Sequence, residues 1–185
     1  MKPIYLIPLG NGFSGAGIEP GLDLLEQLAA TLARTFRTPC QIRPETFDLS
    51  FALDAARGQY YSTAILQRLE RAGDPDARIL GVTAFDLYVP VLTFVFGEAQ
   101  LDGTCAVVST ARLKEEFYGL PASQELLRGR LVKEAVHELG HTFGLRHCAD
   151  WRCVMTSSHA VERLDIKSAD FCSACRKPVF RNGYF

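Results

Sequence analysis

The sequence predicts an α/β (α+β) fold, in which helices pack against a mixed, mostly parallel sheet with an antiparallel edge strand. Short apolar runs typical of buried strands alternate with segments of helical apolar spacing in the first half of the chain. Two later apolar runs follow each other across a short turn, which indicates one antiparallel pair. With 185 residues, the chain is long enough for one domain with a substantial core.

The first elements should be a strand, a helix and a second strand. The run IYLIPLG at 4–10 is apolar and precedes a Gly-rich loop, as expected of a buried strand. The run CQIRP at 40–44 predicts a short strand, and 47–58 should be irregular or loosely helical. A helix is expected over 18–36, because apolar residues recur there at helical spacing: Ile18, Leu22, Leu25, Leu28, Ala29, Leu32 and Phe36.

The next elements should be a helix and three strands. The apolar stripe over 59–72 predicts a helix, which the turn signal GDPDA ends. The run RILGVTA at 78–84 predicts a buried strand, followed by a loop at 85–90. Strands are also expected at 92–97 and 104–109. Because only the turn LDG separates these two, one of them should be the antiparallel edge strand.

A long helix should follow from Ser123, a suitable N-cap, to about residue 143. The composition changes after Gly144, where cysteines and small polar residues become frequent. We therefore expect one domain over 1–185, divided into an N-terminal subdomain 1–144 and a C-terminal subdomain 145–185 that a metal stabilises.

The composition gives no reason to expect a nucleic-acid or membrane partner. The formal net charge is −1, the sequence pI is about 6.4, and no apolar stretch is long enough to span a bilayer. The start, MKPIYLIPLGNG, is not a convincing signal peptide, because its apolar run is short and contains prolines. A soluble, monomeric, cytoplasmic protein is the expectation, with Cys40 and Cys105 as small buried apolar residues.

The stretch HELGHTFGLRH holds three of the four histidines of the chain. His137 and His141 are four residues apart, so a helix places both imidazoles on one face, one turn apart, where they can bind one ion. Glu138 is displaced by about 100° around the axis and can lean over a ligand bound beside them. Alone, H-E-x-x-H also fits an amphipathic helix with two partnered histidines.

The residues after the helix favour a metal site. Gly144 stands where a helix commonly ends in a left-handed residue, so the chain can reverse there and His147 can return as a third ligand. Three neutral imidazoles leave one tetrahedral position open, which is the arrangement of a catalytic zinc site. Glu162, from a downstream helix, is a weaker candidate for the third ligand. His159 could approach the substrate, but it is interpreted as an ordinary polar residue of the surface or the subdomain.

Four cysteines predict a second zinc beside the first. Cys148 is adjacent to His147, and neighbouring side chains in an extended segment point to opposite sides, so each can face a different metal. Cys148, Cys153, Cys172 and Cys175 have the spacings C-x4-C and C-x2-C, and four thiolates form a closed, structural site. A redox pair or buried thiols is the alternative for the last two cysteines.

These residues resemble the metzincin zinc peptidases, and the added set HCADWRCVM…FCSAC resembles the archaemetzincins, a branch with a second, four-cysteine zinc. The segments VTAFDLYVPVLTFVFGEA and VVSTARL are also similar to that family, so the resemblance spans about 80–176. It implies a metzincin-like fold, a catalytic zinc on the three histidines, Glu138 as general base and Met155 as the Met-turn residue. From the sequence pattern alone, Met155 is either an ordinary apolar residue or a packing floor beneath the histidines.

The predicted activity is zinc-assisted hydrolysis of peptide or protein substrates, in which Glu138 takes a proton from water and passes it to the leaving amine. A substrate strand is expected to pair with the edge strand, assigned to 92–97. The alternative is a non-catalytic module in which both zinc ions are structural and which binds a peptide or nucleic acid without cutting it.

Overall fold

The computed structural model describes residues 2–10, 21–43 and 47–180, and its main element is a five-stranded sheet of order β2-β1-β5-β8-β7. Neighbouring strands are parallel except β7, which runs antiparallel to β8 at one edge. This confirms the predicted mixed, mostly parallel sheet. Its strands are β1 (Ile4–Leu9), β2 (Cys40–Ile42), β5 (Arg78–Thr83), β7 (Gly97–Ala99) and β8 (Cys105–Ser109).

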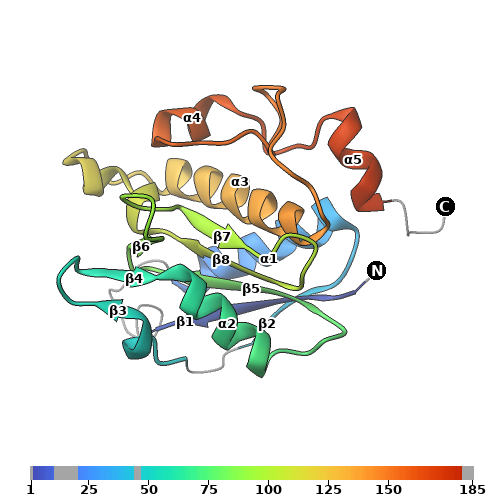
Figure 1. The fold of residues 1–185 in the computed structure, drawn as a ribbon. Coiled ribbons are helices and arrows are strands. Elements are labelled where there is room, and N and C mark those ends of the chain that lie inside the picture. The colour runs from blue at the N-terminus through green and yellow to red at the C-terminus, as the bar shows by residue number, and fades with distance from the viewer. Residues whose placement is uncertain (1, 11–20, 44–46, 181–185) are drawn as a thin grey trace.

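Helices cover both faces of this sheet. Helices α1 (Leu22–Phe36) and α3 (Gln124–Thr142) share one apolar cluster with Leu6, Leu80 and Val108 of the strands. Helix α2 (Ser62–Ala72) packs on the opposite face, in a cluster that includes Leu9 and Val107. Because side chains alternate across a strand, β8 supplies residues to both clusters. Figure 1 shows α2 and α3 on opposite sides of the sheet.

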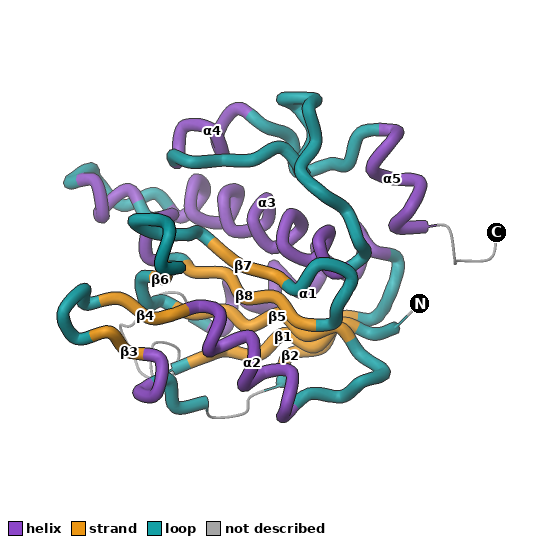
Figure 2. Tube along the Cα trace, in the orientation of Figure 1, coloured by secondary structure: helices purple, strands orange, loops and turns teal. Residues whose placement is uncertain are grey.

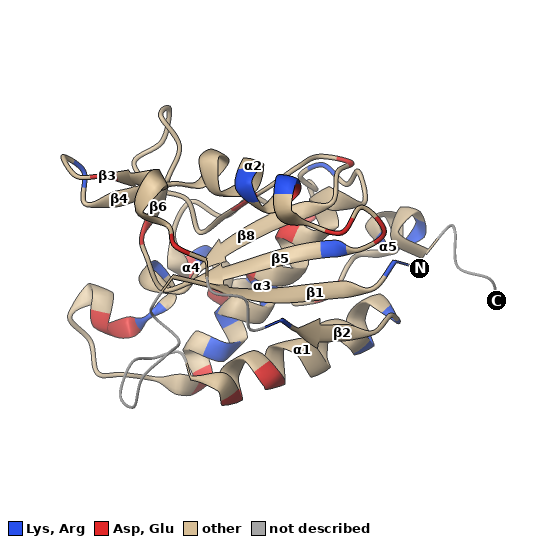
Figure 3. Ribbon diagram, turned by 90° about the horizontal axis from the view of Figure 1, so that it is seen from below, with Lys and Arg blue, Asp and Glu red and all other residues tan. Residues whose placement is uncertain are grey.

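Charged residues lie mainly outside the large sheet. Figure 3 shows lysines, arginines and acidic residues over the helices and loops, whereas β1, β5 and β8 carry almost none. The burial patterns agree, since all residues of β8 and all of β5 except the first are buried. The near-continuous apolar runs that predicted these strands therefore reflect burial on both faces of a mostly parallel sheet.

A second sheet of three short strands lies beside the first, and the sequence did not predict it. Its strands are β3 (Leu53–Asp54), β4 (Gln59–Tyr61) and β6 (Leu87–Tyr88). The predicted helix over 59–72 is wrong in its first turn, because Gln59–Tyr61 form β4 and α2 begins at Ser62. The predicted loop at 85–90 contains β6, which pairs with β4. Pairing between segments distant in sequence decides both differences.

The predicted strand at 92–97 is also wrong, and β7 begins only at Gly97. Residues 92–96 contain no regular strand, and Val95 forms an isolated bridge with Leu87. The backbone carbonyls of Leu92 and Thr93 accept hydrogen bonds from the Arg57 guanidinium instead of from a neighbouring strand. The antiparallel edge of the sheet is therefore the shorter segment Gly97–Ala99.

From the end of α3 to residue 180 the chain is mostly loop, as Figure 2 shows, with two short helices, α4 (Val161–Ile166) and α5 (Ser173–Phe180). Val154, Met155, Leu164 and Val179 from this segment join the cluster that α1 and α3 share. Three short 3-10 helices complete the described elements: η2 (Ser50–Ala52), η3 (Ala111–Leu113) and η4 (Glu115–Tyr118).

Two further sequence expectations concern single residues and membrane spans. Cys105 is fully buried, whereas Cys40 is only partly buried. Burial raises the pKa of the Cys40 thiol to about 12. Within 2–10, 21–43 and 47–180, no helix has the length and apolar character needed to cross a membrane.

Candidate metal centres

Helix α3 carries the first group of candidate ligands. It begins as predicted, because Ser123 is the N-cap and its Oγ accepts a hydrogen bond from Leu126 N at 3.3 Å. His137 and Glu138, near the C-terminal end, are 5 % and 6 % exposed. Two polar groups so deeply buried require partners, which is the first indication of a functional site.

The turn after α3 brings the third histidine back. Gly144 has a φ of 80°, the left-handed conformation that the sequence predicted, and its N–H donates to His141 O at 2.9 Å. As a result, one ring nitrogen from each of His137, His141 and His147 lies within 4.8 Å of the others. The structure thus brings the three predicted ligands together.

Hydrogen bonds to backbone carbonyls fix the tautomers of two of these histidines. His137 Nδ1 lies 2.8 Å from Val154 O, and His141 Nδ1 lies 2.7 Å from Leu145 O. A carbonyl oxygen only accepts, so each Nδ1 must carry the proton. In a neutral ring, Nε2 then holds a lone pair. Burial lowers the pKa of both histidines, that of His137 well below its usual value, so the neutral form is favoured.

The donor set fits a zinc ion. The Nε2 atoms of His137 and His141 are 3.1 Å apart, and two facing lone pairs at that distance repel each other unless a cation lies between them. Zinc–nitrogen bonds of about 2.0–2.1 Å in a tetrahedral site place two nitrogens roughly 3.3 Å apart. The spacing of the imidazoles is therefore close to what one bound ion requires.

Glu138 lies beside the histidines in a groove of about 570 Å³. His137, His141, His147 and residues 92–99 also line this groove. Gly97 of β7 approaches Glu138 closely, since a Cβ at Gly97 would lie 2.7 Å from Glu138 Cγ. Burial, and secondarily the carboxyl group of Glu134, raise the pKa of Glu138 well above its usual value.

A buried ion pair lies next to Glu138, and the sequence analysis missed it. Lys167 Nζ is 3.1 Å from Glu134 Oε1, and both side chains are almost completely buried. The Lys167 charge opposes the increase in the pKa of Glu138 and contributes to the low pKa of His137. Glu134 stands four residues before Glu138, a helical spacing that could have drawn attention to it, but no local signal identifies Lys167.

Met155 packs against α3. It is fully buried, and a Cβ at Gly140 would collide with its sulfur. Gly140 stands between the two helical histidines, so the thioether occupies the space that a larger residue in α3 would fill. The Met155 carbonyl also accepts a hydrogen bond from Cys148 N at 2.9 Å, which connects this turn to the cysteine cluster.

The four predicted cysteines form a second cluster, in which all sulfur atoms lie within 4.8 Å of one another. Cys148 Sγ and Cys172 Sγ are 3.8 Å apart, far longer than a disulfide bond. Two thiolates on one zinc, with bonds of about 2.3 Å, lie roughly 3.8 Å apart. His147 and Cys148, adjacent in sequence, belong to different clusters as expected.

Backbone hydrogen bonds support the thiolate form of one cysteine. Principally because Cys175 N–H points at its sulfur, the pKa of Cys172 falls to about 7. Cys172 N in turn donates to Cys153 Sγ at 3.3 Å. Such N–H groups stabilise negative sulfur, as a metal–thiolate site requires.

Among the described residues, neither Glu162 nor His159 belongs to a cluster of candidate metal ligands. Glu162 is an exposed residue of α4, and the histidine group found among the described residues does not include it. His159 is exposed, lines the groove, and lies 3.4 Å from Ser157 Oγ through its Nε2.

Comparison with known proteins agrees with this geometry. Residues 30–181 match the family model described as Peptidase family M54. The chain is 40 % identical to the archaemetzincin of Methanocaldococcus jannaschii over 171 residues, which cover 91 % of this chain and 94 % of that protein. It is 47 % identical to the archaemetzincin of Methanopyrus kandleri over 131 residues, covering 71 % of each.

Solved structures give the same result. The crystal structure of archaemetzincin from Archaeoglobus fulgidus, complexed with malonate, matches with a TM-score of 0.77 and 39 % identity, covering 95 % of this chain and 99 % of that one. The archaemetzincin structure from Methanopyrus kandleri matches with a TM-score of 0.82 and 35 % identity, covering 98 % and 94 %. From its sequence, its fold and its histidine triad, this chain belongs to the archaemetzincin family of zinc metallopeptidases, peptidase family M54.

Proposed function

We propose that this chain hydrolyses peptide bonds, with a catalytic zinc held by His137, His141 and His147 and with Glu138 as general base. The observation that carries the proposal is the convergence of the imidazole nitrogens in a groove that Glu138 also lines. Membership of a peptidase family favours this function over a non-catalytic binding module, and a peptide substrate follows from the same membership. A structural site would have no need of a buried acid next to its ligand.

The chemistry divides between the ion and the protein. Zinc, when bound, supplies a Lewis acid that polarises the substrate carbonyl and lowers the pKa of water to about 7. Glu138 accepts the proton from the attacking water and delivers it to the leaving amine. The carbonyls of Val154 and Leu145 hold the rings of His137 and His141 in the tautomer that keeps Nε2 free for the metal.

We further propose that Cys148, Cys153, Cys172 and Cys175 hold a structural zinc that stabilises the C-terminal subdomain 145–185. Its described part, 145–180, has two short helices and otherwise loops, so a metal cross-link would replace part of the regular structure that this part lacks. Met155 would be the Met-turn residue, packed against α3 below the catalytic histidines.

The substrate would bind as an extended strand along β7. Within the described residues, Gly97–Ala99 pair with β8 on one side only, so the other edge of β7 can pair with a peptide backbone. This edge replaces the predicted segment 92–97. Gly97 lies against Glu138, so a peptide along this edge would run past the general base.

Removal of zinc tests the proposal. The zinc-loaded protein should cleave members of a random octapeptide library, and a chelator should abolish cleavage that added zinc restores. Zinc analysis during mild chelation should show one ion leaving much faster than the other, because a three-histidine site is open and a four-thiolate site is closed. Cleavage that persists in the fully metal-free protein, or a zinc-loaded protein that cleaves no peptide, would contradict the proposal.

Gly97→Ala should shift the Glu138 carboxylate and lower activity without affecting metal binding. The new Cβ would lie 2.7 Å from both Glu138 Cγ and the backbone oxygen of Val107, so either the strand or the carboxylate must move. A misplacement of about 1 Å in catalytic geometry can cost roughly 100-fold, and we expect kcat/KM to fall about 10- to 100-fold with two zinc ions retained. Gly129→Ala, on an open face of α3, is the matched control and should leave kcat/KM unchanged.

A further inference from the structure

One wall of the groove is a segment with no regular strand or helix. Residues 92–96 line the groove, as do Ser157 and Ser158 from the C-terminal segment. Leu92 is 49 % exposed and the preceding Val91 is 88 % exposed. We call 92–96 the rim segment. Val95 N donates to Leu87 O and Phe96 O accepts from Ser109 N, so the backbone of this segment is held at its C-terminal end. The carbonyls of Leu92 and Thr93 have side chains as their hydrogen-bond partners instead.

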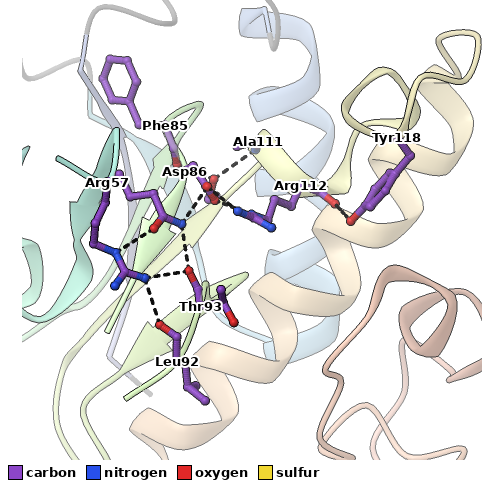
Figure 4. A network of polar contacts seen from close by, with 10 residues as sticks. Arg57, Phe85, Asp86, Leu92, Thr93, Ala111, Arg112 and Tyr118 are labelled. Atoms are coloured by element: carbon purple, nitrogen blue, oxygen red, sulfur yellow. Dashed lines mark hydrogen bonds and ion pairs between the residues drawn. The ribbon is translucent and has the colours of Figure 1, made fainter. Parts of the chain in front are cut away.

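An arginine in the β3–β4 turn provides part of this support. Arg57 Nη2 donates to Leu92 O at 3.2 Å and to Thr93 O at 3.0 Å, which anchors two consecutive carbonyls of the rim segment (Figure 4). The same guanidinium stacks on the Tyr88 ring, with 4.3 Å between Cζ and the ring centroid. Arg57 therefore joins the small sheet to the wall of the groove across 35 residues of sequence.

Gln59 and Asp86 extend this support into the fold. Gln59 Oε1 accepts from Arg57 Nε at 2.9 Å, and its Nε2 donates both to Thr93 O at 3.0 Å and to Asp86 at 2.8 Å. Gln59 is 6 % exposed, so this amide has little water available as an alternative partner. The buried Gln59 amide therefore orients the Arg57 guanidinium and also contacts the rim segment directly.

A second arginine supports the next residue of the rim. Arg112 makes a two-bond ion pair with Asp86, at 2.7 and 2.8 Å, as Figure 4 shows. Its guanidinium lies over the Phe94 ring at 4.2 Å, and Phe94 packs edge-on against Phe96. Asp86 thus connects Arg112, which stacks on Phe94, to Gln59, which contacts Thr93.

We propose that Arg57, held by Gln59, is a positioning residue for extended peptide substrates. In this proposal, the β3-β4-β6 sheet is the brace of the rim segment, by which we mean that its side chains hold the backbone of 92–96 in one conformation. This inference rests on the proposed peptidase function for its effect on activity, but the bracing itself can be measured without turnover. Arg57 lines no part of the groove, so it would act through the rim segment and not on the reacting atoms.

The test is Arg57→Ala, measured in two ways on the zinc-loaded protein. Hydrogen exchange of the backbone amides in 92–96 should become about tenfold faster, because the anchored carbonyls are released. For an octapeptide that the wild type cleaves, KM should rise about tenfold while kcat stays within about twofold, since the rim contributes binding away from the scissile bond. A tripeptide amide around the same scissile bond, too short to extend along the rim, should show unchanged KM.

Arg43→Ala is the matched control, because Arg43 also stacks on a tyrosine, at 3.5 Å from the Tyr5 ring, but follows β2 at the opposite edge of the sheet. It should change neither the exchange of 92–96 nor KM. Arg57→Ala with wild-type exchange in 92–96 would overturn the brace, and equal losses of kcat for both peptides would overturn the positioning role. If the wild type cleaves no peptide at all, the proposed function fails while the exchange measurement still decides the brace.

Discussion

Glu138→Ala is expected to lower kcat for peptide hydrolysis about 100- to 10,000-fold while the protein keeps both zinc ions. Glu138 is not one of the predicted metal ligands, and its side chain lines the groove beside them. Its removal should therefore eliminate proton transfer without disturbing the imidazoles. The measurements are steady-state kinetics on a peptide that the wild type cleaves and zinc analysis of the same preparation.

The control is Glu125→Ala, which makes the same substitution at an exposed position in the first turn of α3. Its kcat should equal that of the wild type. Near-normal turnover in Glu138→Ala would refute the assignment of the general base. Loss of one zinc in that variant would instead show that Glu138 supports metal binding, which the proposal does not allow.

Cys153→Ser is expected to reduce the zinc content from two ions to one and to lower the unfolding temperature by at least about 10 °C. Cys153 is 1 % exposed and its sulfur accepts the Cys172 N–H, so the hydroxyl would leave a poor metal ligand inside a buried cluster. Structural zinc sites contribute folding free energy directly, and a segment of loops and two short helices has little regular structure to replace it. Calorimetry and zinc analysis measure the two effects.

Cys153→Ser should also weaken metal binding at the three histidines, although Cys153 is not part of that cluster. Val154, next to Cys153, holds the His137 ring through its carbonyl, and Met155 accepts the Cys148 N–H. We therefore expect the remaining zinc to dissociate faster on chelation than the corresponding ion of the wild type. Cys40→Ala, at a partly buried thiol outside the cluster, should keep two ions and a near-normal unfolding temperature. Two ions and an unchanged transition in Cys153→Ser would contradict a structural zinc there.

Much of the fold and of the site could be predicted because their signals are local. The strands β1, β5 and β8 are short apolar runs bounded by turns, and helix α3 has a capping Ser123 at one end and Gly144 at the other. The three histidines and four cysteines stand at spacings that only a few backbone conformations can satisfy. Helix geometry fixes His137 and His141, and a left-handed glycine fixes the return of His147.

Predictions failed where long-range pairing decides the structure. Gln59–Tyr61 share an apolar stripe with α2 but form β4, because β6 offers a partner some 27 residues away. Residues 92–96 are as apolar as a strand, yet the carbonyls of Leu92 and Thr93 accept hydrogen bonds from the side chains of Arg57 and Gln59. Short segments of this kind have weak intrinsic preferences, so tertiary contacts determine their conformation.

The sequence by itself determined the mostly parallel core, the membership of the histidine and cysteine clusters, and the position of Glu138 on its helix. Only the tertiary structure decided what surrounds them: the Lys167–Glu134 pair, the approach of Gly97 to Glu138, and the brace of Arg57 behind the rim segment. Ligand spacing follows from the period of one helix and one turn, which a few residues encode. The electrostatic field and the shape of the groove depend on side chains that are tens of residues apart in sequence. Those side chains come close to one another only when the chain folds.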